Sequence, residues 1–288
     1  MKSKQKYGIV AGEDIDMPSD YISKHGITQY EFNLSWDGVL KNRKDIYKKM
    51  QESLNKPEAG TPRTSQPSAG VLNELFQKEL KSYEELFVVT LSSKLSGCYN
   101  SAIQAKEMLD EENRSKIHII ESPSSTCGSA FLMRKLVEMI EKEASVKEIL
   151  SNLDVVKQQT RLVAMIEDSY WLQKGGRMSP AIGMIVNQMK KINLRPLLTA
   201  KDGKIALLNV RTNVQDKVQA LVQYLEKEIS ETNVELVITH ADNIAEADIL
   251  KKSLQKKSNI KLLYVNQLSP VLGAHLGPYS LVVAWKAC

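Results

Sequence analysis

Uninterrupted apolar runs alternate with amphipathic stretches along the first half of the chain. The runs at Leu86–Leu91 and Ile117–Ile120 carry few polar side chains, which is typical of parallel strands that are buried on both faces of a sheet. The run Tyr7–Val10 has the same character. A polar loop follows each run, and residues with apolar positions at helical spacing follow each loop. This repetition predicts an α/β fold with a mostly parallel sheet and flanking helices.

The pattern changes after about residue 158. A short strand at Leu162–Ile166 precedes two strand-like runs, Leu197–Ala200 and Ile205–Val210, and the sequence Asp202-Gly203 lies between them. Asp-Gly between two such runs is a strong signal for a two-residue β-hairpin. A hairpin among α/β units indicates that the second half of the chain forms a mixed sheet.

At 288 residues the chain is long for one compact core, so we expect two domains, residues 1–157 and 158–288. No linker rich in glycine or serine separates them, which indicates close packing. The same patterns predict further helices around 21–22, at 45–54, 71–80 and 99–109, before 140, and at 145–156, 167–174, 179–192, 214–229 and 245–254. They predict further strands at 27–34, 235–240, 260–265 and 281–285, and a glycine-containing loop at 269–277.

Three hydroxyl-rich loops fall where strands of this sheet would lead into helices, at 62–68, 92–96 and 122–126. In an open parallel sheet such loops meet at the carboxyl edge of the strands, where ligands bind. Serine or threonine just before a helix caps its first amides. The same amides and the helix dipole can hold an anion. For Thr64 and Ser96, both capping and anion binding remain open.

Composition and charge argue against several classes of protein, although the net charge and the lysine clusters leave a nucleic-acid or regulatory binding module as a third hypothesis. The net charge of +5 is mild, and the lysine clusters on two predicted helices are typical of solvated faces rather than of a nucleic-acid-binding stripe. Cys98, Cys127 and Cys288 form neither a CxxC pair nor a metal-ligand spacing. The N-terminus lacks a signal-peptide core, and no apolar run reaches membrane-spanning length. We expect a soluble cytoplasmic protein without metal, cofactor, nucleic acid or integral membrane association.

The sequence lacks the familiar catalytic signatures. It contains no nucleophile elbow G-x-S-x-G, no Walker phosphate loop, no G-x-G-x-x-G and no H-E-x-x-H. The isolated polar residues that remain include Arg177 beside two glycines, Arg211 at a strand end and His275 among small residues. Hydroxyls, helix N-termini and a cation suit a carboxylate or phosphate that is bound without being attacked.

Taken together, these segments form a family pattern. The motif residues are Thr64-Ser65-Gln66-Pro67-Ser68, Leu91–Gly97 with Tyr99, Leu172 with Lys174-Gly175-Gly176-Arg177, Leu194 with Pro196, Asp202-Gly203-Lys204, Val210-Arg211 and Gly273–Pro278. They are collinear and span nearly the whole chain. The chain resembles the DegV family, whose better-understood members are the fatty-acid-binding subunits of bacterial fatty acid kinase.

The resemblance implies two α/β domains with a long-chain fatty acid, such as palmitate, stearate or oleate, buried between them. It implies that Thr64 and Ser96 hold the carboxylate, with His275 and Arg177 nearby. Ser65, Ser93 and Gly97 belong to the same motifs and are further candidate ligand-binding residues. Arg211 would lie where a kinase subunit docks. That partner would bind ATP and form the acyl phosphate, so this chain is not expected to be a catalyst.

Four segments depart from the family pattern, among them residues 36–44 and Ser269-Pro270. Ala11-Gly12-Glu13 stands where a Thr-Asp-Ser sequence is usual, and a bulky tyrosine interrupts Gly277-Pro278-Tyr279-Ser280. These changes leave the carboxylate-binding set intact but bear on the shape of the pocket. Apolar lining is available from helices such as 181–186. The alternative function is an acyl hydrolase or acyl-transfer enzyme, with Ser96 as nucleophile and His275 as base.

Overall fold

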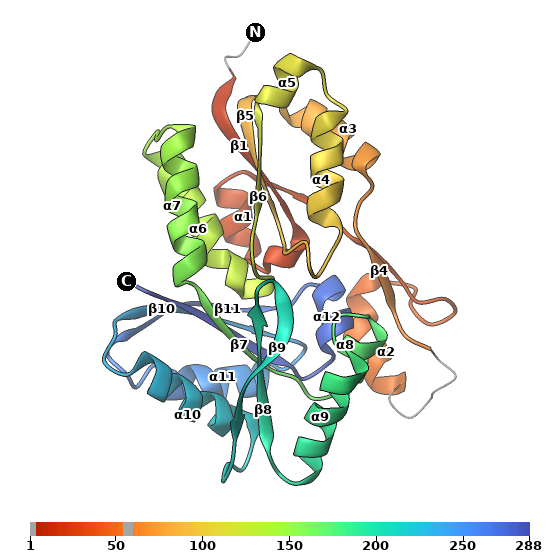
Figure 1. Ribbon diagram of the computed structural model, residues 1–288, viewed down its shortest axis with the longest axis vertical. Helices are drawn as coiled ribbons and strands as arrows, with labels where there is room; N and C mark the ends of the chain where they lie inside the picture. The colour runs from red at the N-terminus through yellow and green to blue at the C-terminus, as the bar shows by residue number, and fades with distance from the viewer. Residues whose placement is uncertain (1–3, 54–59) are drawn as a thin grey trace.

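Two β-sheets, one above the other in Figure 1, organise the fold. The computed structural model describes residues 4–53 and 60–288. The first sheet has the order β2-β1-β5-β6, and all its neighbouring strands are parallel. Its strands are Ile27–Tyr30 (β2), Gln5–Gly12 (β1), Tyr83–Thr90 (β5) and Ile117–Glu121 (β6). The predicted parallel sheet is therefore confirmed.

Helices cover both faces of the first sheet (Figure 1). One group comprises α1 (Ser19–Lys24), α6 (Ala130–Glu141) and α7 (Val146–Gln159), and the other α3 (Ala69–Glu79), α4 (Cys98–Glu107) and α5 (Glu111–Ser115). Helix α3 begins where its sequence predicts, because the Ser68 side chain accepts the backbone N–H of Val71 at 3.3 Å. Helix α7 begins with the capping box of Ser145 and Glu148.

The second sheet is mixed, with the order β11-β10-β12-β7-β8-β9. Its strands are Ile260–Gln267, Val234–His240, Leu281–Ala287, Arg161–Met165, Arg195–Lys201 and Lys204–Arg211, in that spatial order. Strands β10 and β11 are parallel, and the other neighbours are antiparallel. The predicted hairpin is confirmed: β8 and β9 meet at Asp202 and Gly203, both with positive φ, as a type I′ turn requires.

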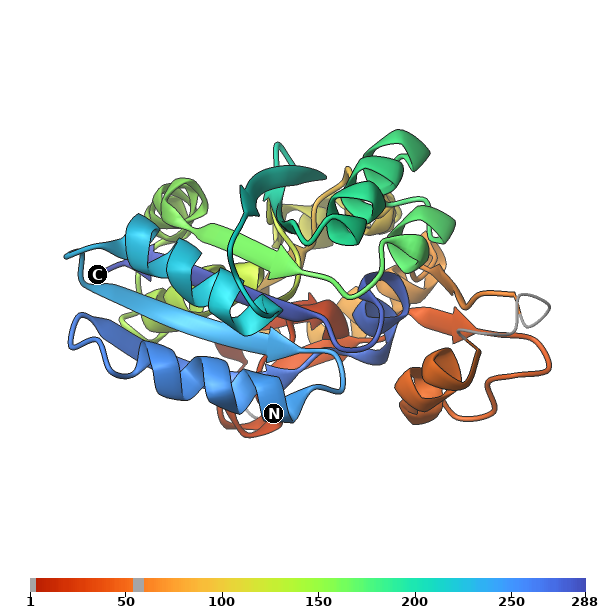
Figure 2. The ribbon, with the colours of Figure 1, turned by 90° about the horizontal axis from the view of Figure 1, so that it is seen from below.

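The two faces of the second sheet pack against different cores. Along β12, Val282 and Ala284 belong to the core shared with the first sheet. Leu281, Val283 and Trp285 belong to a separate core beneath α10 (Lys217–Ile229) and α11 (Ile244–Leu254). This alternation follows from the two-residue period of a strand. Figure 2 shows both helices covering the outer face, so the inner face of the sheet is turned toward the first sheet.

Two predicted elements were wrong. Residues 269–277 do not form a loop, because Pro270–Leu276 is a helix, α12, with proline in its first turn. The space that a side chain at Gly273 would need is filled by the ring of Tyr47, and the Tyr47 hydroxyl donates to the backbone oxygen of Leu268 at 2.9 Å. The glycine that lowers helix propensity thus permits close packing against α2 (Ile46–Ser53).

The single strand predicted at 27–34 is divided. It ends as β2 at Tyr30, and Asn33–Ser35 (β3) pairs in antiparallel fashion with Arg63–Ser65 (β4). Thr64 therefore lies on a short strand opposite Leu34, not in an open loop. The predicted helix end at Leu54 falls outside the described residues.

Short segments complete the chain between these elements. They are the 3₁₀ turns Glu13–Ile15 (η1), Arg43–Asp45 (η2) and Thr126–Ser129 (η4), and the helices Tyr170–Lys174 (α8) and Pro180–Lys191 (α9). The proposed domain boundary at 157/158 falls in the last turn of α7, before the first strand of the mixed sheet. Within the described residues, no helix has the length and apolarity to cross a membrane.

Candidate functional site

A narrow cavity lies between the inner face of the second sheet and the carboxyl ends of the first sheet's strands. The centre of a water molecule can reach about 70 Å³ of it, several times the roughly 10–15 Å³ that one water needs. Its surface is mostly apolar. The lining comprises Asp14, Phe32, Thr64, Gln66, Leu91, Leu95, Ser96, Ser125, Thr126, Leu162, Ala164, Leu172, Arg177, Leu198, Thr199, Ala200, Ile205, Val271, Leu272, His275, Leu276 and Val282.

Thr64 and His275 meet in this cavity although 211 positions separate them in sequence. The Thr64 hydroxyl and His275 Nε2 are 2.7 Å apart, a good hydrogen-bonding distance. Strand β4 presents Thr64, and α12 presents His275 near its last turn. The fold thus brings together two of the residues that the family resemblance assigns to the ligand carboxylate.

The environment of His275 keeps its ring neutral. The side chain is buried, and a Cβ at Gly175 would lie 2.3 Å from Nδ1, so only glycine leaves room for the ring. Burial and the positive charge of Arg177 lower the pKa of His275 to about 3. Its Nδ1 has no hydrogen-bond partner among the described residues. A neutral imidazole can donate or accept one hydrogen bond at Nε2, depending on its tautomer.

Arg177 is held beside the same end of the cavity. Its Nε donates to the backbone oxygen of Leu95 at 3.1 Å, and Nη1 donates to that of Gly175 at 2.5 Å. Gly176 precedes it with a φ of 73°, a conformation that favours glycine and turns the chain sharply after α8. Burial lowers the pKa of the guanidinium, but Arg177 remains a cation. An anionic ligand group here would face a fixed positive charge.

Ser96 both lines the cavity and contacts the start of α4. Its hydroxyl accepts the backbone N–H of Cys98 at 3.2 Å, while Gly97 occupies the cap position of the helix. The Gln66 side chain lies directly over Gly97, where a Cβ would be 2.6 Å from Nε2. Capping and ligand contact therefore do not exclude each other at Ser96, because a hydroxyl that accepts one hydrogen bond can still donate another.

Four candidates lie outside the cavity lining: Gly97, Ser65, Ser93 and Arg211. Ser65 is exposed and accepts a hydrogen bond from Asn33 at 3.3 Å. The backbone N–H of Ser93 donates to Glu121 at 2.7 Å. Arg211, at the end of β9, lies over the ring of Tyr224 at 5.6 Å and donates to a carbonyl of α10. No residue of α9 is in the lining, so the apolar lining expected from residues 181–186 is absent. Apolar residues of strands β7, β8, β9 and β12 and of helix α12 line the cavity instead.

Sequence reasoning missed several polar groups in the lining. Thr126 was predicted only as part of the hydroxyl-rich loop 122–126, Thr199 only as part of a strand, and Gln66 only as part of a motif. Asp14 was also overlooked, although it stands beside the unusual Ala11-Gly12-Glu13 segment. That departure was the one signal that could have found it. Among the described residues, no group of three or more histidine, cysteine or acidic side chains could hold a metal ion.

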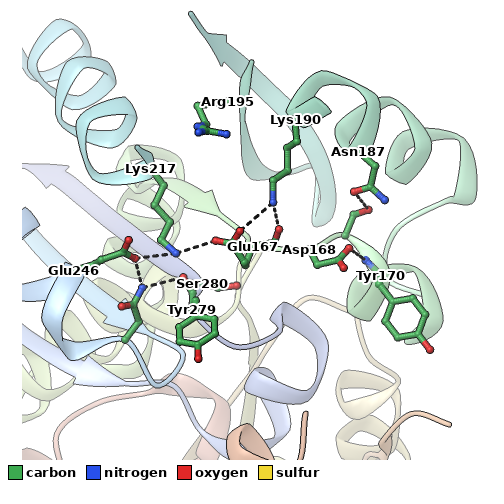
Figure 3. Close-up of polar contacts among 12 residues, drawn as sticks. Glu167, Asp168, Tyr170, Asn187, Lys190, Arg195, Lys217, Glu246, Tyr279 and Ser280 are labelled. Carbon is green, nitrogen blue, oxygen red and sulfur yellow. Dashed lines mark hydrogen bonds and ion pairs between the residues drawn. The ribbon is translucent and has the colours of Figure 1, made fainter. Parts of the chain in front are cut away.

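A second polar cluster lies beyond the C-terminal end of β7 (Figure 3). The Lys217 ammonium contacts Glu246 at 2.8 Å and Glu167 at 3.0 Å, and Lys190 also contacts Glu167. Lys217 lies 5.8 Å from the ring centre of Tyr279. The atypical Tyr279 thus belongs to this cluster. None of the cluster's residues lines the cavity. We interpret the cluster as a set of ion pairs that stabilises the packing of α9, α10 and α11 against the end of β7.

Comparison with known sequences identifies the family. The sequence model of the DegV family matches residues 6–287. The chain belongs to the DegV family. It is 30% identical over 277 residues to a DegV domain-containing protein of Staphylococcus aureus strain COL, covering 93% of this chain and 94% of that relative. A DegV domain-containing protein of Caldanaerobacter subterraneus is 27% identical over 278 residues, 95% of this chain and 96% of the relative.

Solved DegV structures share the fold over the full length. A DegV family protein from Thermus thermophilus described as binding fatty acid has a TM-score of 0.85 and 18% identity, covering 99% of this chain and 100% of that one. A stearic-acid-binding protein from Eubacterium ventriosum has a TM-score of 0.82 and 24% identity, covering 98% of each chain. DegV from Bacillus subtilis, described as a fatty acid binding protein, has a TM-score of 0.78 and 22% identity, covering 99% of this chain and 100% of that one. The predicted two-sheet α/β fold is confirmed.

Proposed function

We propose that this DegV protein binds a long-chain fatty acid in the cavity between its two sheets. Thr64 and Ser96 hold the carboxylate, with His275 and Arg177 beside them. The observation that carries the proposal is the contact of Thr64 with His275 next to Arg177, in a cavity that is otherwise mostly apolar. Each buried methylene contributes about 0.8 kcal/mol, so the acyl chain supplies most of the affinity and the polar groups orient the ligand.

The structure offers matched controls for the two hydroxyls. Thr64→Val and Ser65→Ala each remove one hydroxyl from β4, and only Thr64 lines the cavity. Ser96→Ala and Ser93→Ala form a second pair in the next loop. We expect Thr64→Val and Ser96→Ala to weaken binding of oleate by about 1–3 kcal/mol each, the cost of a hydrogen bond lost to a charged group. Ser65→Ala and Ser93→Ala should bind oleate as the wild type does.

The direct assay is denaturing mass spectrometry of the purified protein after organic extraction, followed by exchange with palmitate, stearate or oleate. A fatty acid that co-purifies or exchanges supports the proposal. Failure of all three acids to bind would refute it. Weakened binding in both members of each pair would instead assign the hydroxyls to folding rather than to the ligand.

We further propose that the bound acid is presented to a kinase subunit that binds ATP and forms the acyl phosphate. Arg211 is the docking candidate, and its place at the end of β9, away from the cavity lining, separates docking from binding. Arg211→Ala should leave oleate binding intact and reduce acyl phosphate formation by a reconstituted kinase. Equal acyl phosphate formation by wild type and variant would exclude Arg211 from docking.

Hydrolysis is the alternative, and the geometry argues against it. His275 Nε2 faces Thr64 rather than a serine nucleophile. Its pKa of about 3 makes it a weak base. Among the described residues no group hydrogen bonds to Nδ1 to orient the ring as in a catalytic triad. Turnover of activated acyl esters by the wild type, lost in Ser96→Ala or Thr64→Val, would establish an enzyme instead.

A further inference from the structure

Asp14 places a carboxyl group in the cavity that the proposed carboxylate site does not use. It lies in η1, directly after β1, is 1% exposed and lines the cavity. Its Oδ1 has no hydrogen-bond partner among the described residues. The acidic neighbours differ: Glu13 pairs with Arg43, and Asp16 accepts the backbone N–H of Ser269 at 2.7 Å. The second oxygen of Asp16, Oδ2, also lacks a partner, but Asp16 does not line the cavity. Asp14 is therefore the acidic residue of this turn that brings an unpartnered oxygen to the cavity lining.

The unusual sequence Gly12-Glu13-Asp14 explains this position. A Cβ at residue 12 would lie 2.0 Å from Asp14 Oδ1, so the carboxyl occupies the space that a side chain at this position would fill. The rings of Tyr30 and Phe32 border the same space, each with an atom 2.9 Å from that Cβ position. Glycine at 12 thus admits the Asp14 carboxyl between two aromatic side chains, where water has little access.

Different neighbours shift the pKa values of Asp14 and His275. Burial raises the pKa of Asp14 to about 7, and the negative charge of Glu13 adds to the rise. The pKa of His275 is lowered by burial and Arg177 instead. Asp14 is thus a separate ionisable group of the cavity, distinct from the Thr64–His275 pair, in a lining that also holds the hydroxyls of Ser125, Thr126 and Thr199.

An unmodified acyl chain cannot satisfy Asp14. A buried polar atom without a hydrogen-bond partner destabilises a complex by about 1–3 kcal/mol. A methylene chain that displaces water from the cavity offers Asp14 no partner and leaves this penalty unchanged. A hydroxyl on the chain removes it, because a hydroxyl can donate to a carboxylate and can also accept from a protonated carboxyl. A site built to pair with a hydroxyl discriminates strongly against the analogue that lacks it.

We propose that the cavity prefers a long-chain fatty acid that carries a hydroxyl group on its chain, which hydrogen bonds to Asp14. This inference rests on the proposed fatty-acid binding and names the class of acid within it. Asp14 would act as a specificity residue, while Thr64 and Ser96 hold the carboxylate of either acid.

The test compares stearate with a series of hydroxystearates that carry the hydroxyl at position 2, 3, 10 or 12, measured by competition against a fluorescent fatty acid. We expect at least one hydroxystearate to bind the delipidated wild type about tenfold or more tighter than stearate, the equivalent of one hydrogen bond to a charged group. Asp14→Leu, which has similar volume and no polar atom, should lose or reverse this preference. Asp14→Asn should retain a preference because its amide can pair with a hydroxyl.

The outcomes separate this inference from the function on which it rests. Binding of stearate without a preference for any hydroxystearate would overturn the role of Asp14 and leave fatty-acid binding intact. An unchanged preference in Asp14→Leu would also overturn it. Failure of every acid to bind would refute the proposed function itself. If Asp14→Leu does not fold, Asp14→Ala takes its place, because it also removes the carboxyl group: the preference should be lost, and an unchanged preference would overturn the inference.

Discussion

Mild acid should destabilise the ligand-free protein, because His275 binds a proton in the unfolded chain but not in the folded one. The ring has an ordinary pKa of 6.5, and in the folded protein it is about 3 because the ring is buried beside Arg177. Between these values the unfolded chain binds a proton at His275 and the folded chain does not. The contribution of His275 to the free energy of unfolding is therefore undiminished above pH 6.5 and falls as the pH decreases toward 3.

The magnitude follows from the size of this shift. One pH unit in this range corresponds to about 1.4 kcal/mol, so lowering the pH from 6.5 to 5.0 should remove about 2 kcal/mol. His275→Gln keeps a polar side chain that can contact Thr64 but does not titrate. The difference in unfolding free energy between wild type and His275→Gln should therefore change by about 2 kcal/mol over this interval, to the disadvantage of the wild type.

Urea unfolding of delipidated protein, followed by tryptophan fluorescence at several pH values, measures this difference. Other titrating groups are common to both proteins, so their contributions cancel. Nitrogen NMR of the imidazole supplies an independent readout, in which the ring of folded wild type should remain neutral at pH 5. A difference that stays constant from pH 6.5 to 5.0, or a ring that is charged at pH 5, would refute the assigned environment of His275.

Three further predictions concern other parts of the structure. The pKa of Asp14 is raised from 3.8 to about 7. The contribution of the protonated carboxyl to the free energy of unfolding is therefore fully present below pH 3.8, and about 4 kcal/mol of it is lost as the pH rises to 7. Urea unfolding at several pH values should show this loss in wild type and not in Asp14→Asn. Gly175→Ala places a Cβ 2.3 Å from His275 Nδ1 and should destabilise the protein by about 1–3 kcal/mol and weaken oleate binding, whereas unchanged melting and binding would contradict the packing described. Lys217→Met should lower stability by about 1–2 kcal/mol, because it leaves Glu167 and Glu246 without their shared partner; high salt should reduce the wild-type advantage, and a salt-independent loss would instead indicate packing.

Local sequence patterns predicted those parts of the fold in which local chemistry decides the structure. The apolar runs of β5 and β6 form parallel strands, although only the run of β5 is buried throughout and β6 is partly buried at the edge of the sheet; Asp202-Gly203 forms the hairpin turn. The pattern failed at α12, because Gly273 has low helix propensity and its helix is stabilised by Tyr47 from a distant segment. It failed again at 27–34, because the pairing of β3 with β4 joins residues about thirty positions apart.

The candidate site was predictable only in part, for the same physical reason. The hydroxyl loops could be found from their sequence, but either capping or anion binding explained them equally well. The contact of Thr64 with His275 depends on packing between segments 211 positions apart, and only the family resemblance suggested it. The atypical Ala11-Gly12-Glu13 segment could draw attention to Asp14, but its place in the cavity could not be predicted, because its burial depends on Gly12, Tyr30 and Phe32 together.

The most direct test of fatty-acid binding is a crystal structure of the delipidated protein reloaded with oleate. The account predicts an acyl chain between the two sheets, with the carboxylate oxygens within hydrogen-bonding distance of the Thr64 and Ser96 hydroxyls. An oleate with its carboxylate away from these residues, or bound on another surface with the cavity closed, would contradict it.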